Sequence, residues 1–242
     1  MTSNIDSSTA NNSTANSSMA DNSTDSTATV GTSETPVYEG QFGSFTIDKD
    51  DRQEVVLYRA GLVIAAFSFG CAVLCLFLLP AAAVQVATVC YGLLWLGLGL
   101  SLFKIHIYVK PLHQALQAFW AVGGLASLAI ALLYPTPLAL TAYQQPLTIF
   151  GIGFTFAALT GIFFKEAFCF NRLETKFLVF IVPGLLLGHM AGAFSVATER
   201  SILVAWAALF AVFALRKVVQ PIPPDIGDKS VFEYLAKERQ AA

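Results

Sequence analysis

The sequence predicts an all-α, polytopic membrane protein: a transmembrane helical bundle of six spans with both termini inside, on the cytoplasmic face. Charged residues make up only 12% of the 242 residues, whereas a soluble domain carries about 25%. Residues 61–103 and 111–164 contain no Lys, Arg, Asp or Glu. Because about 20 apolar residues cross the roughly 30 Å hydrocarbon core of a bilayer, each stretch is long enough for two spans.

The N-terminal part of the chain is predicted to lie outside the membrane. Residues 1–36 are rich in Ser, Thr and Asn, a composition typical of a disordered tail. Residues 37–59 form a juxtamembrane segment, in which two glycines predict a small hairpin or tight loop. The acidic residues that follow complement the dipole of a helix that begins near residue 49, with Thr46 or Asp48 as its N-cap.

The transmembrane domain is predicted to cover residues 60–216, and residues 217–242 form a cytoplasmic tail with a short helix. The predicted spans are Ala60–Leu79, Ala83–Phe103, Leu112–Leu133, Leu147–Phe164, Phe177–Phe194 and Ile202–Leu215. In the tail, the prolines of Gln220–Pro224 predict an extended connector. Ser230 and Glu233 have the spacing of a capping box that opens the short helix.

The basic residues set the orientation of this bundle. Cytoplasmic loops of membrane proteins carry an excess of Lys and Arg. With six spans, 13 of the 14 basic residues fall on the side of the termini, and only Arg200 falls on the other. One span more or fewer would distribute these residues over both sides, so the sorting also supports the number of spans.

The predicted spans lack the groups that membrane enzymes and coupled transporters use. No Asp, Glu, Lys or Arg lies in the apolar part of a span, where ion-coupled transporters place such a group. Hydrolase, zinc-protease and ATPase motifs do not occur, and the cysteines have no metal-ligand spacing. We therefore expect no enzymatic activity, no metal site and no nucleic-acid partner.

His189, in the predicted fifth span, is the candidate cofactor ligand. Gly184, Gly188 and Gly192 surround it at four-residue spacing, which lets another helix or a flat ring approach closely. A neutral imidazole there could ligate the metal of a tetrapyrrole. The alternative is a helix-packing seam without a cofactor, in which His189 bonds a neighbouring carbonyl.

The two polar segments on the inner face form a second candidate site. One joins spans two and three, and the other joins spans four and five. The second segment also carries acidic residues, which predict an ordered, salt-bridged loop, since membrane topology needs only basic ones. Such a loop is a candidate partner or lipid interface, and plain anchoring at the headgroups is the alternative. The candidate residues are Lys104, His106, Lys110, His113, Lys165, Glu166, Arg172 and Glu174.

Four stretches carry a family resemblance. These are Val37–Phe45 (VYEGQFGSF), Leu57–Gly61 (LYRAG), Lys165–Glu174 (KEAFCFNRLE) and Leu187–His189 (LGH). Residues 37–220 resemble a family of uncharacterised integral membrane proteins from cyanobacteria and plastids. The resemblance implies a thylakoid or plasma membrane location but no chemistry. Because residues 1–36 lack the features of a transit peptide, a cyanobacterial origin is expected.

Three functions remain open. The first is a non-enzymatic partner or assembly factor of a membrane complex, for which the resemblance suggests a photosynthetic one. The second is a pigment- or haem-associated protein that uses His189. The third is a passive channel or carrier for a neutral solute. In that case the lining residues would be Gln85, Tyr91, Ser101 and Gln117. The expected partners are the lipid bilayer and either such a complex or further copies of the chain.

Overall fold

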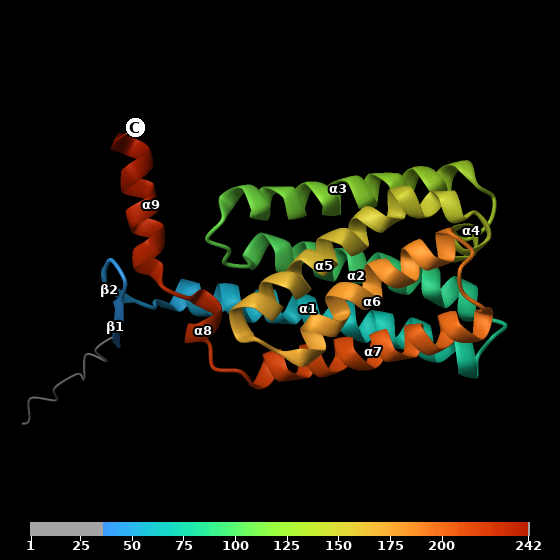
Figure 1. Cartoon of the computed structure of the whole chain (residues 1–242), viewed down its shortest axis with the longest axis horizontal. Coiled ribbons are helices and arrows are strands. Elements are labelled where there is room, and N and C mark those ends of the chain that lie inside the picture. Colours follow the sequence, from blue (N-terminus) through green and yellow to red (C-terminus); the bar gives the residue numbers. More distant parts are fainter. Residues whose placement is uncertain (1–35, 242) are drawn as a thin grey trace, which may run out of the picture. The chain divides into compact units, whose positions relative to one another are not determined.

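The computed structural model describes residues 36–241, so the prediction for the first 35 residues lies outside the described part. Six long helices form a bundle (Figure 1). Each is long and apolar enough to cross a membrane, which confirms the predicted all-α bundle of six spans. The six helices are α1 (Lys49–Leu78), α2 (Ala83–Lys104), α3 (Lys110–Leu133), α5 (Ile149–Phe170), α6 (Leu173–Met190) and α7 (Val196–Val219).

The helices pack pairwise, α1 against α2 and α7, and α5 against α3 and α6. The backbones of α1 and α2 approach closely, so that a Cβ at Gly97 would lie 2.7 Å from the carbonyl oxygen of Gly61. Close packing of this kind stabilises helix pairs where lipid removes the hydrophobic driving force. Leu62, Phe163 and Phe210, all fully buried, lie in the apolar core.

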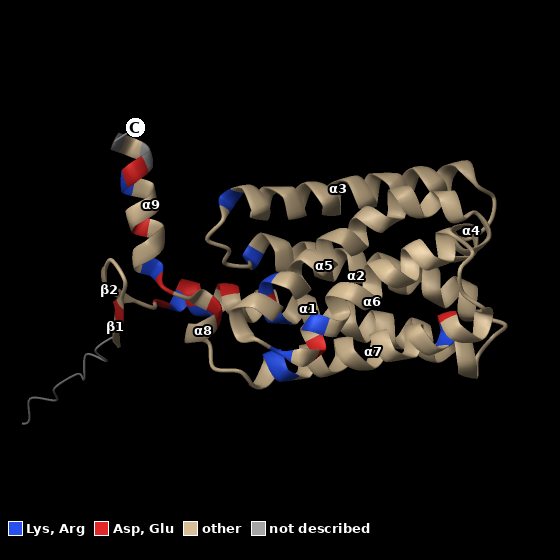
Figure 2. Cartoon of the chain, viewed as in Figure 1, with Lys and Arg blue, Asp and Glu red and all other residues tan. Residues whose placement is uncertain are grey.

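The two ends of the bundle differ in charge (Figure 2). Most of the Lys, Arg, Asp and Glu residues gather where α1, α3 and α6 begin and where α2, α5 and α7 end. We call this the charged end. The far end holds the short helices α4 (Leu138–Gln144) and η1 (Pro146–Thr148), and there Glu199 and Arg200 lie in the first turns of α7.

Within residues 36–241, the segments outside the six long helices are short. Strands β1 (Val37–Gly40) and β2 (Gly43–Thr46) pair antiparallel, with Val37 opposite Thr46, which confirms the predicted hairpin. Helix α1 begins at Lys49, as predicted, and Asp48 caps it: its side chain accepts from the N–H of Asp51, whose side chain accepts from the N–H of Asp48. After α7 come α8 (Pro223–Ile226) and α9 (Lys229–Ala241).

Several boundaries differ from the predicted ones. Helix α6 ends at Met190, four residues before the predicted end of the fifth span, because Gly192 adopts a left-handed backbone (φ 62°). The Ser195 side chain then caps α7. At the other end, α7 continues to Val219, so the predicted tail begins inside the helix. The connector is extended at Gln220 but turns helical at Pro223.

Candidate functional site

Charged side chains from four helices meet in a buried group at the charged end. We call it the ion cluster. Its members are Arg59 of α1, Lys165 and Glu166 of α5, Lys217 of α7 and Asp225 of α8. Each of these side chains is at most 10% exposed, and those of Glu166, Lys217 and Asp225 at most 3%. A buried charge needs partners, and each of these has at least one.

Arg59 connects the bundle to the chain that follows α7. Its Nε and Nη2 donate to Asp225 Oδ2 at 2.8 and 2.6 Å. Its remaining donors reach two backbone carbonyls, those of Gln220 at 2.6 Å and Pro221 at 2.9 Å. The planar guanidinium thereby fixes a carboxylate and two peptide groups at once, for which its fork of donors is suited.

Lys217 lies between two carboxylates. Its Nζ is 2.6 Å from Glu166 Oε2 and also donates to Asp225 Oδ1. The ammonium lies over the Phe170 ring, 4.1 Å from the centroid, a favourable cation–π position. A single cation of α7 thus joins α5 to α8.

Glu166 completes the cluster from α5. Its Oε1 accepts from the Tyr58 hydroxyl at 2.9 Å and from Lys165 Nζ at 3.0 Å. With Lys217 on the other oxygen, the carboxylate contacts α1, α5 and α7. Removing one partner of a buried ion pair typically costs about 3–5 kcal/mol. The contacts of Glu166 therefore stabilise one arrangement of the ends of α1, α5 and α7.

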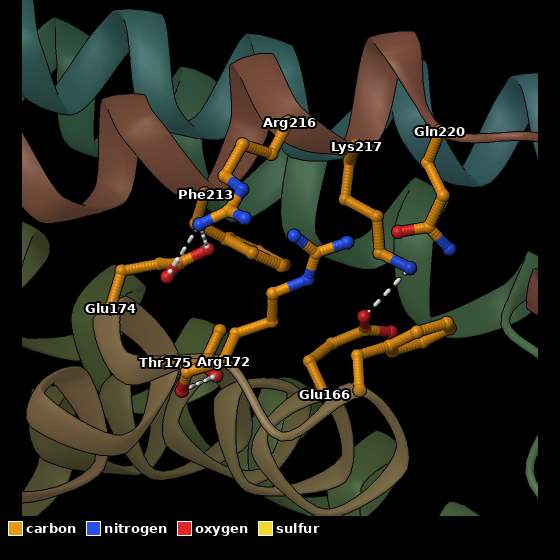
Figure 3. Close-up of a pocket in the computed structure, with 9 residues that line it drawn as sticks. Glu166, Arg172, Glu174, Thr175, Phe213, Arg216, Lys217 and Gln220 are labelled. Atoms are coloured by element: carbon orange, nitrogen blue, oxygen red, sulfur yellow. Dashed lines mark hydrogen bonds and ion pairs between the residues drawn. The ribbon is translucent and has the colours of Figure 1, made fainter.

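A second ion pair borders the cluster (Figure 3). Arg216 Nη1 lies 3.1 Å from both carboxylate oxygens of Glu174, and the Arg216 side chain is 49% exposed. Beside it is a cavity of about 10 Å³, lined also by Arg172 and Lys217. That space suits one water molecule, and Glu174 Oε1, buried and without a hydrogen bond among the described residues, would accept from it.

The hairpin and the tail helices pack together outside the apolar part of the bundle. We call this group, residues 37–46 and 223–241, the platform. Asp228 Oδ2 accepts from the N–H of Gln41 at 2.6 Å, and the Ser230 hydroxyl accepts from the N–H of Phe42 at 3.0 Å. The Phe42 ring stacks on Tyr234, with centroids 4.1 Å apart.

Further contacts join the platform to the bundle. Ile226 is buried with Ile47 and Val55 of the α1 region. Lys229 Nζ lies 2.6 Å from Asp51 Oδ2. The Phe232 ring stacks on Tyr108 of the α2–α3 connection, with centroids 4.7 Å apart. Together with the ion pairs of Asp225, these contacts hold the platform against the charged end of the bundle.

The predicted partner residues of the Lys165–Glu174 segment do not form an exposed loop. Lys165 and Glu166 are helical and buried in the ion cluster, and Glu174 pairs with Arg216 rather than with Arg172. The loop between α5 and α6 shrinks to Asn171, in a left-handed conformation (φ 51°), and Arg172. These residues therefore make contacts within the chain, and Arg172, half-buried in the turn, lines the small cavity.

Three of the four predicted residues around the α2–α3 connection also make contacts within the chain. Lys104 Nζ lies 3.1 Å from Glu54, and His106 Nε2 lies 3.5 Å from the same carboxylate. Burial lowers the pKa of His106, and this effect outweighs the acidic neighbours that raise it. His113 Nε2 lies 2.6 Å from the carbonyl oxygen of Leu102. Lys110, at the start of α3, is exposed.

His189 lies in the last turn of α6, at the far end. Its Nδ1 is 2.7 Å from Glu199 Oε1 and its Nε2 is 3.1 Å from the carbonyl oxygen of Tyr143, whose ring stacks on the imidazole at 5.0 Å. Both nitrogens have partners, and one of them is a neighbouring carbonyl, as in the alternative without a cofactor. The predicted helix-packing seam is not formed, because a Cβ at Gly184 or Gly192 would meet no atom within 4 Å. The group predicted to line a channel is dispersed: Ser101 donates to the Tyr58 carbonyl at 2.9 Å, whereas Gln85 is exposed.

The ion cluster is not evident from the sequence. Arg59 and Lys217 counted only as topology signals, and Asp225, directly after the predicted connector Gln220–Pro224, had no predicted role. One signal was present: an acidic residue among the inner-face lysines and arginines has no topological purpose. That signal pointed to Glu166 but could not name its partners, since Tyr58 lies 108 residues away in the sequence.

Comparison with known proteins places the chain in a family. The family model described as "Uncharacterized integral membrane protein (DUF2301)" matches residues 100–234, which is more than half of the 242 residues. The chain belongs to this family. The DUF2301 match runs from the end of α2 into α9 and includes Glu166, Lys217 and Asp225. No curated protein and no solved structure matches the chain.

Proposed function

We propose that this DUF2301 protein is a non-enzymatic partner or assembly factor of a membrane complex, and that the platform is where it meets that complex. The membrane is the thylakoid or plasma membrane of a cyanobacterium, and the complex is a photosynthetic one. The family resemblance supports this location, and the platform geometry supports the role.

One observation carries the proposal: the buried ion cluster joins the platform to the helix bundle. Asp225 begins the platform and is held by Arg59 of α1 and Lys217 of α7, each almost fully buried. Burying five charges is costly unless each is well paired. An arrangement that holds a small extramembrane unit in one orientation suits a protein that presents a surface to another.

The outer side of α9 is the recognition surface that we propose. Glu233, Ala236, Lys237 and Gln240 are exposed and recur at three- and four-residue spacing, so they share one face of the helix. Phe232 lies about a quarter turn away around α9 and packs on Tyr108. Because α9 is already folded and packed against the rest of the chain, less ordering entropy would be lost on binding.

The same proposal places the charged end, and with it both termini, in the cytoplasm. Figure 2 shows the basic residues concentrated at that end. Arg200 lies near the start of α7, at the far end. This distribution is the one that the positive-inside rule associates with the cytoplasmic side.

The test is purification of the tagged full-length protein from native membranes in mild detergent, followed by a native gel. The decisive variant exchanges Glu233 and Lys237 (E233K/K237E). It keeps the net charge and an i,i+4 pair, so the stability of α9 should change by only about 0.5 kcal/mol, yet it inverts the charge pattern of the outer face. The control is Lys176→Glu, an exposed position on α6 outside the platform.

We expect the wild-type protein and the Lys176→Glu control to migrate in a larger assembly, and the exchanged variant to leave it. Migration of the wild type as a small band alone would contradict the proposal. So would an assembly that retains the exchanged variant.

A further inference from the structure

Arg172 belongs to the residues that the sequence predicts for a partner or lipid interface, and its guanidinium has no hydrogen bond or ion pair within residues 36–241. The side chain is half-buried. Figure 3 shows it reaching from the turn between α5 and α6 toward α7, where Arg216 and Lys217 lie. A guanidinium has five N–H donors, and one that has lost part of its water needs acceptors. An acceptor from outside the chain would stabilise it.

Positive charge exceeds negative charge around this guanidinium. The small cavity beside it is lined by three cations and two carboxylates, namely Arg172, Arg216, Lys217, Glu166 and Glu174. Each carboxylate is already paired with one of the two cations from α7. The adjoining ion cluster also holds three cations and two carboxylates. A surplus of positive charge in a partly dehydrated site attracts an anion.

Glu174 adds a second unsatisfied group at the same cavity. Its side chain is only 7% exposed, and its Oε1 has no hydrogen bond among the described residues. The cavity of about 10 Å³ has room for one water, and a water can donate two hydrogen bonds. With one donated to Glu174 Oε1, the other is available to an oxygen at the opening of the cavity. An anion with several oxygens, bound there by Arg172, would therefore complete both groups.

The start of α6 also favours an anion at this position. Arg172 is the N-cap residue of this 18-residue helix, and no side chain caps it. By contrast, the side chains of Asp48 and Ser195 cap α1 and α7. The first N–H groups of an uncapped helix are unsatisfied and carry partial positive charge, which adds to the attraction of the guanidinium.

The surroundings of the cavity point to the membrane as the source of the anion. Leu173 of α6 and Leu215 and Val219 of α7 are all largely exposed. In an integral membrane protein, acyl chains cover side chains of this kind. The cavity lies where α6 begins and α7 ends, which is the level of the lipid headgroups. Basic pockets between transmembrane helices at this level suit phosphate headgroups.

We propose that Arg172 and Arg216 bind the phosphate of an anionic phospholipid in the leaflet at the charged end. Arg216 uses only Nη1 for Glu174, and its side chain is 49% exposed, so its other donors face outward. The phosphate oxygens accept from both guanidiniums and from the cavity water, and the acyl chains run along α6 and α7. A zwitterionic headgroup fits less well, because its own cation enters a site that already has a surplus of positive charge. This site is separate from the platform and does not depend on its role.

Native mass spectrometry of the full-length protein in detergent micelles tests the proposal. The protein is titrated with dioleoylphosphatidylglycerol or with dioleoylphosphatidylcholine, and the dissociation constant of the first bound lipid is measured. The test variant is Arg172→Gln. The matched control is Lys110→Gln, which removes the same charge from an exposed position at the same end, at the start of α3.

We expect Arg172→Gln to bind phosphatidylglycerol about tenfold more weakly than the wild type, because a hydrogen bond between charged groups is lost. Lys110→Gln should change the affinity by less than about twofold, as expected for an exposed charge. The wild type should bind phosphatidylcholine more weakly than phosphatidylglycerol. Equal weakening in the two variants, or equal affinity of the wild type for the two lipids, would overturn the proposal.

Two further measurements complete the test. Inorganic phosphate at the concentration of the lipid should not displace phosphatidylglycerol; displacement would assign the site to a free anion and overturn the lipid assignment. In detergent without lipid, Arg172→Gln should unfold at the same denaturant concentration as the wild type, because its side chain has no partner in the described chain. A large loss of stability there would show that Arg172 is bound within the protein, which would also overturn the proposal.

Discussion

The two ends of the bundle hold charged side chains in different ways. At the charged end, Lys217 and Asp225 have side chains only 3% and 1% exposed, in a cluster that joins α1, α5, α7 and α8. At the far end, His189 and Glu199 form a single pair with side chains 17% and 15% exposed. That pair joins α6 to α7, ten residues apart in the sequence.

The difference shows what each set of contacts can do. A pair between sequence neighbours fixes one turn, whereas the ion cluster closes loops of more than 100 residues, such as that between Tyr58 and Glu166. The free-energy cost of losing one charge also differs between the two ends. Buried charges have given up their hydration, so each depends on its ion-pair partner for compensation. We therefore expect the charged end to respond strongly to the loss of one charge, and the far end only weakly.

The largest effect is expected for Lys217→Met. This change leaves Glu166 and Asp225 without their shared cation, and removal of one partner of a buried ion pair costs about 3–5 kcal/mol. The measurement is the free energy of unfolding in mild detergent micelles, by chemical denaturation followed through Trp fluorescence.

Lys176→Met is the matched control for Lys217→Met. Lys176 is also a lysine at the charged end, but it is exposed. Its removal should change the stability by less than about 0.5 kcal/mol. Equal losses of unfolding free energy in the two variants would show that the buried Lys217 contributes no more to stability than an exposed lysine.

A shape change in the uncharged middle of the bundle should come next. Gly99→Ala would place its Cβ 2.6 Å from the Trp120 ring, and overpacking of this kind costs about 1–3 kcal/mol. Gly70→Ala is the control with the opposite sign. A Cβ at Gly70 meets no atom within 4 Å, so removing a helical glycine should stabilise by about 0.5–1 kcal/mol. Both values come from the same unfolding experiment, and destabilisation by Gly70→Ala would contradict the packing described for the glycines.

At the far end, Glu199→Gln should cost less than about 1 kcal/mol, the usual net worth of one hydrogen bond, because the bond to His189 can be kept. The glutamine keeps an acceptor for His189 Nδ1, 2.7 Å from the carboxylate in the structure. Arg200→Gln, at an exposed neighbouring position, serves as the control and should be neutral. A loss as large as that of Lys217→Met would remove the distinction between the two ends.

The smallest effect concerns the platform. The N–H of Gln41 and then the hydroxyl of Ser230 donate to Asp228 and lower its pKa below the ordinary 3.8. A carboxyl whose pKa is lower in the folded state stabilises above the unfolded pKa, and this contribution is lost as the pH falls through the folded pKa. The Asp228 contacts should therefore persist at pH 5 and weaken only below about pH 4.

The pKa of Asp228 can be measured by NMR of ¹³C-labelled aspartate, with Asp228→Asn for assignment. A value above 3.8 would show that the contacts with Gln41 and Ser230 do not hold in solution.

The sequence determines the spans more fully than it determines the site. Long apolar stretches without charges have one stable location, so the six helices followed from hydropathy alone. The start of α1 also followed, because its cap involves only Asp48 and Asp51, which are near in the sequence. Capping signals can be recognised from the sequence because the residues involved are close together in the chain.

The ion cluster depends on pairs that no local pattern specifies. Arg59 and Asp225 are separated by 166 residues, and the prolines after Gln220 predicted an extended chain where α8 turns back toward Arg59. The reciprocal contact between Trp95 of α2 and Trp120 of α3 is an intermediate case. Its Trp-x-x-x-Gly pattern is visible in both helices, but the reciprocal contact requires knowing that α2 and α3 are neighbours.

The most direct test of the central claim is the distance between the platform and the bundle. Spin labels at exposed Lys110 of α3 and exposed Lys237 of α9, in a background without the four native cysteines, report that distance by double electron–electron resonance. We predict one narrow distance distribution in the otherwise unchanged chain and in Lys176→Met, and a broad one in Lys217→Met. A broad distribution without the Lys217 change, or a narrow one that survives it, would contradict the claim that the buried ion cluster holds the platform in place.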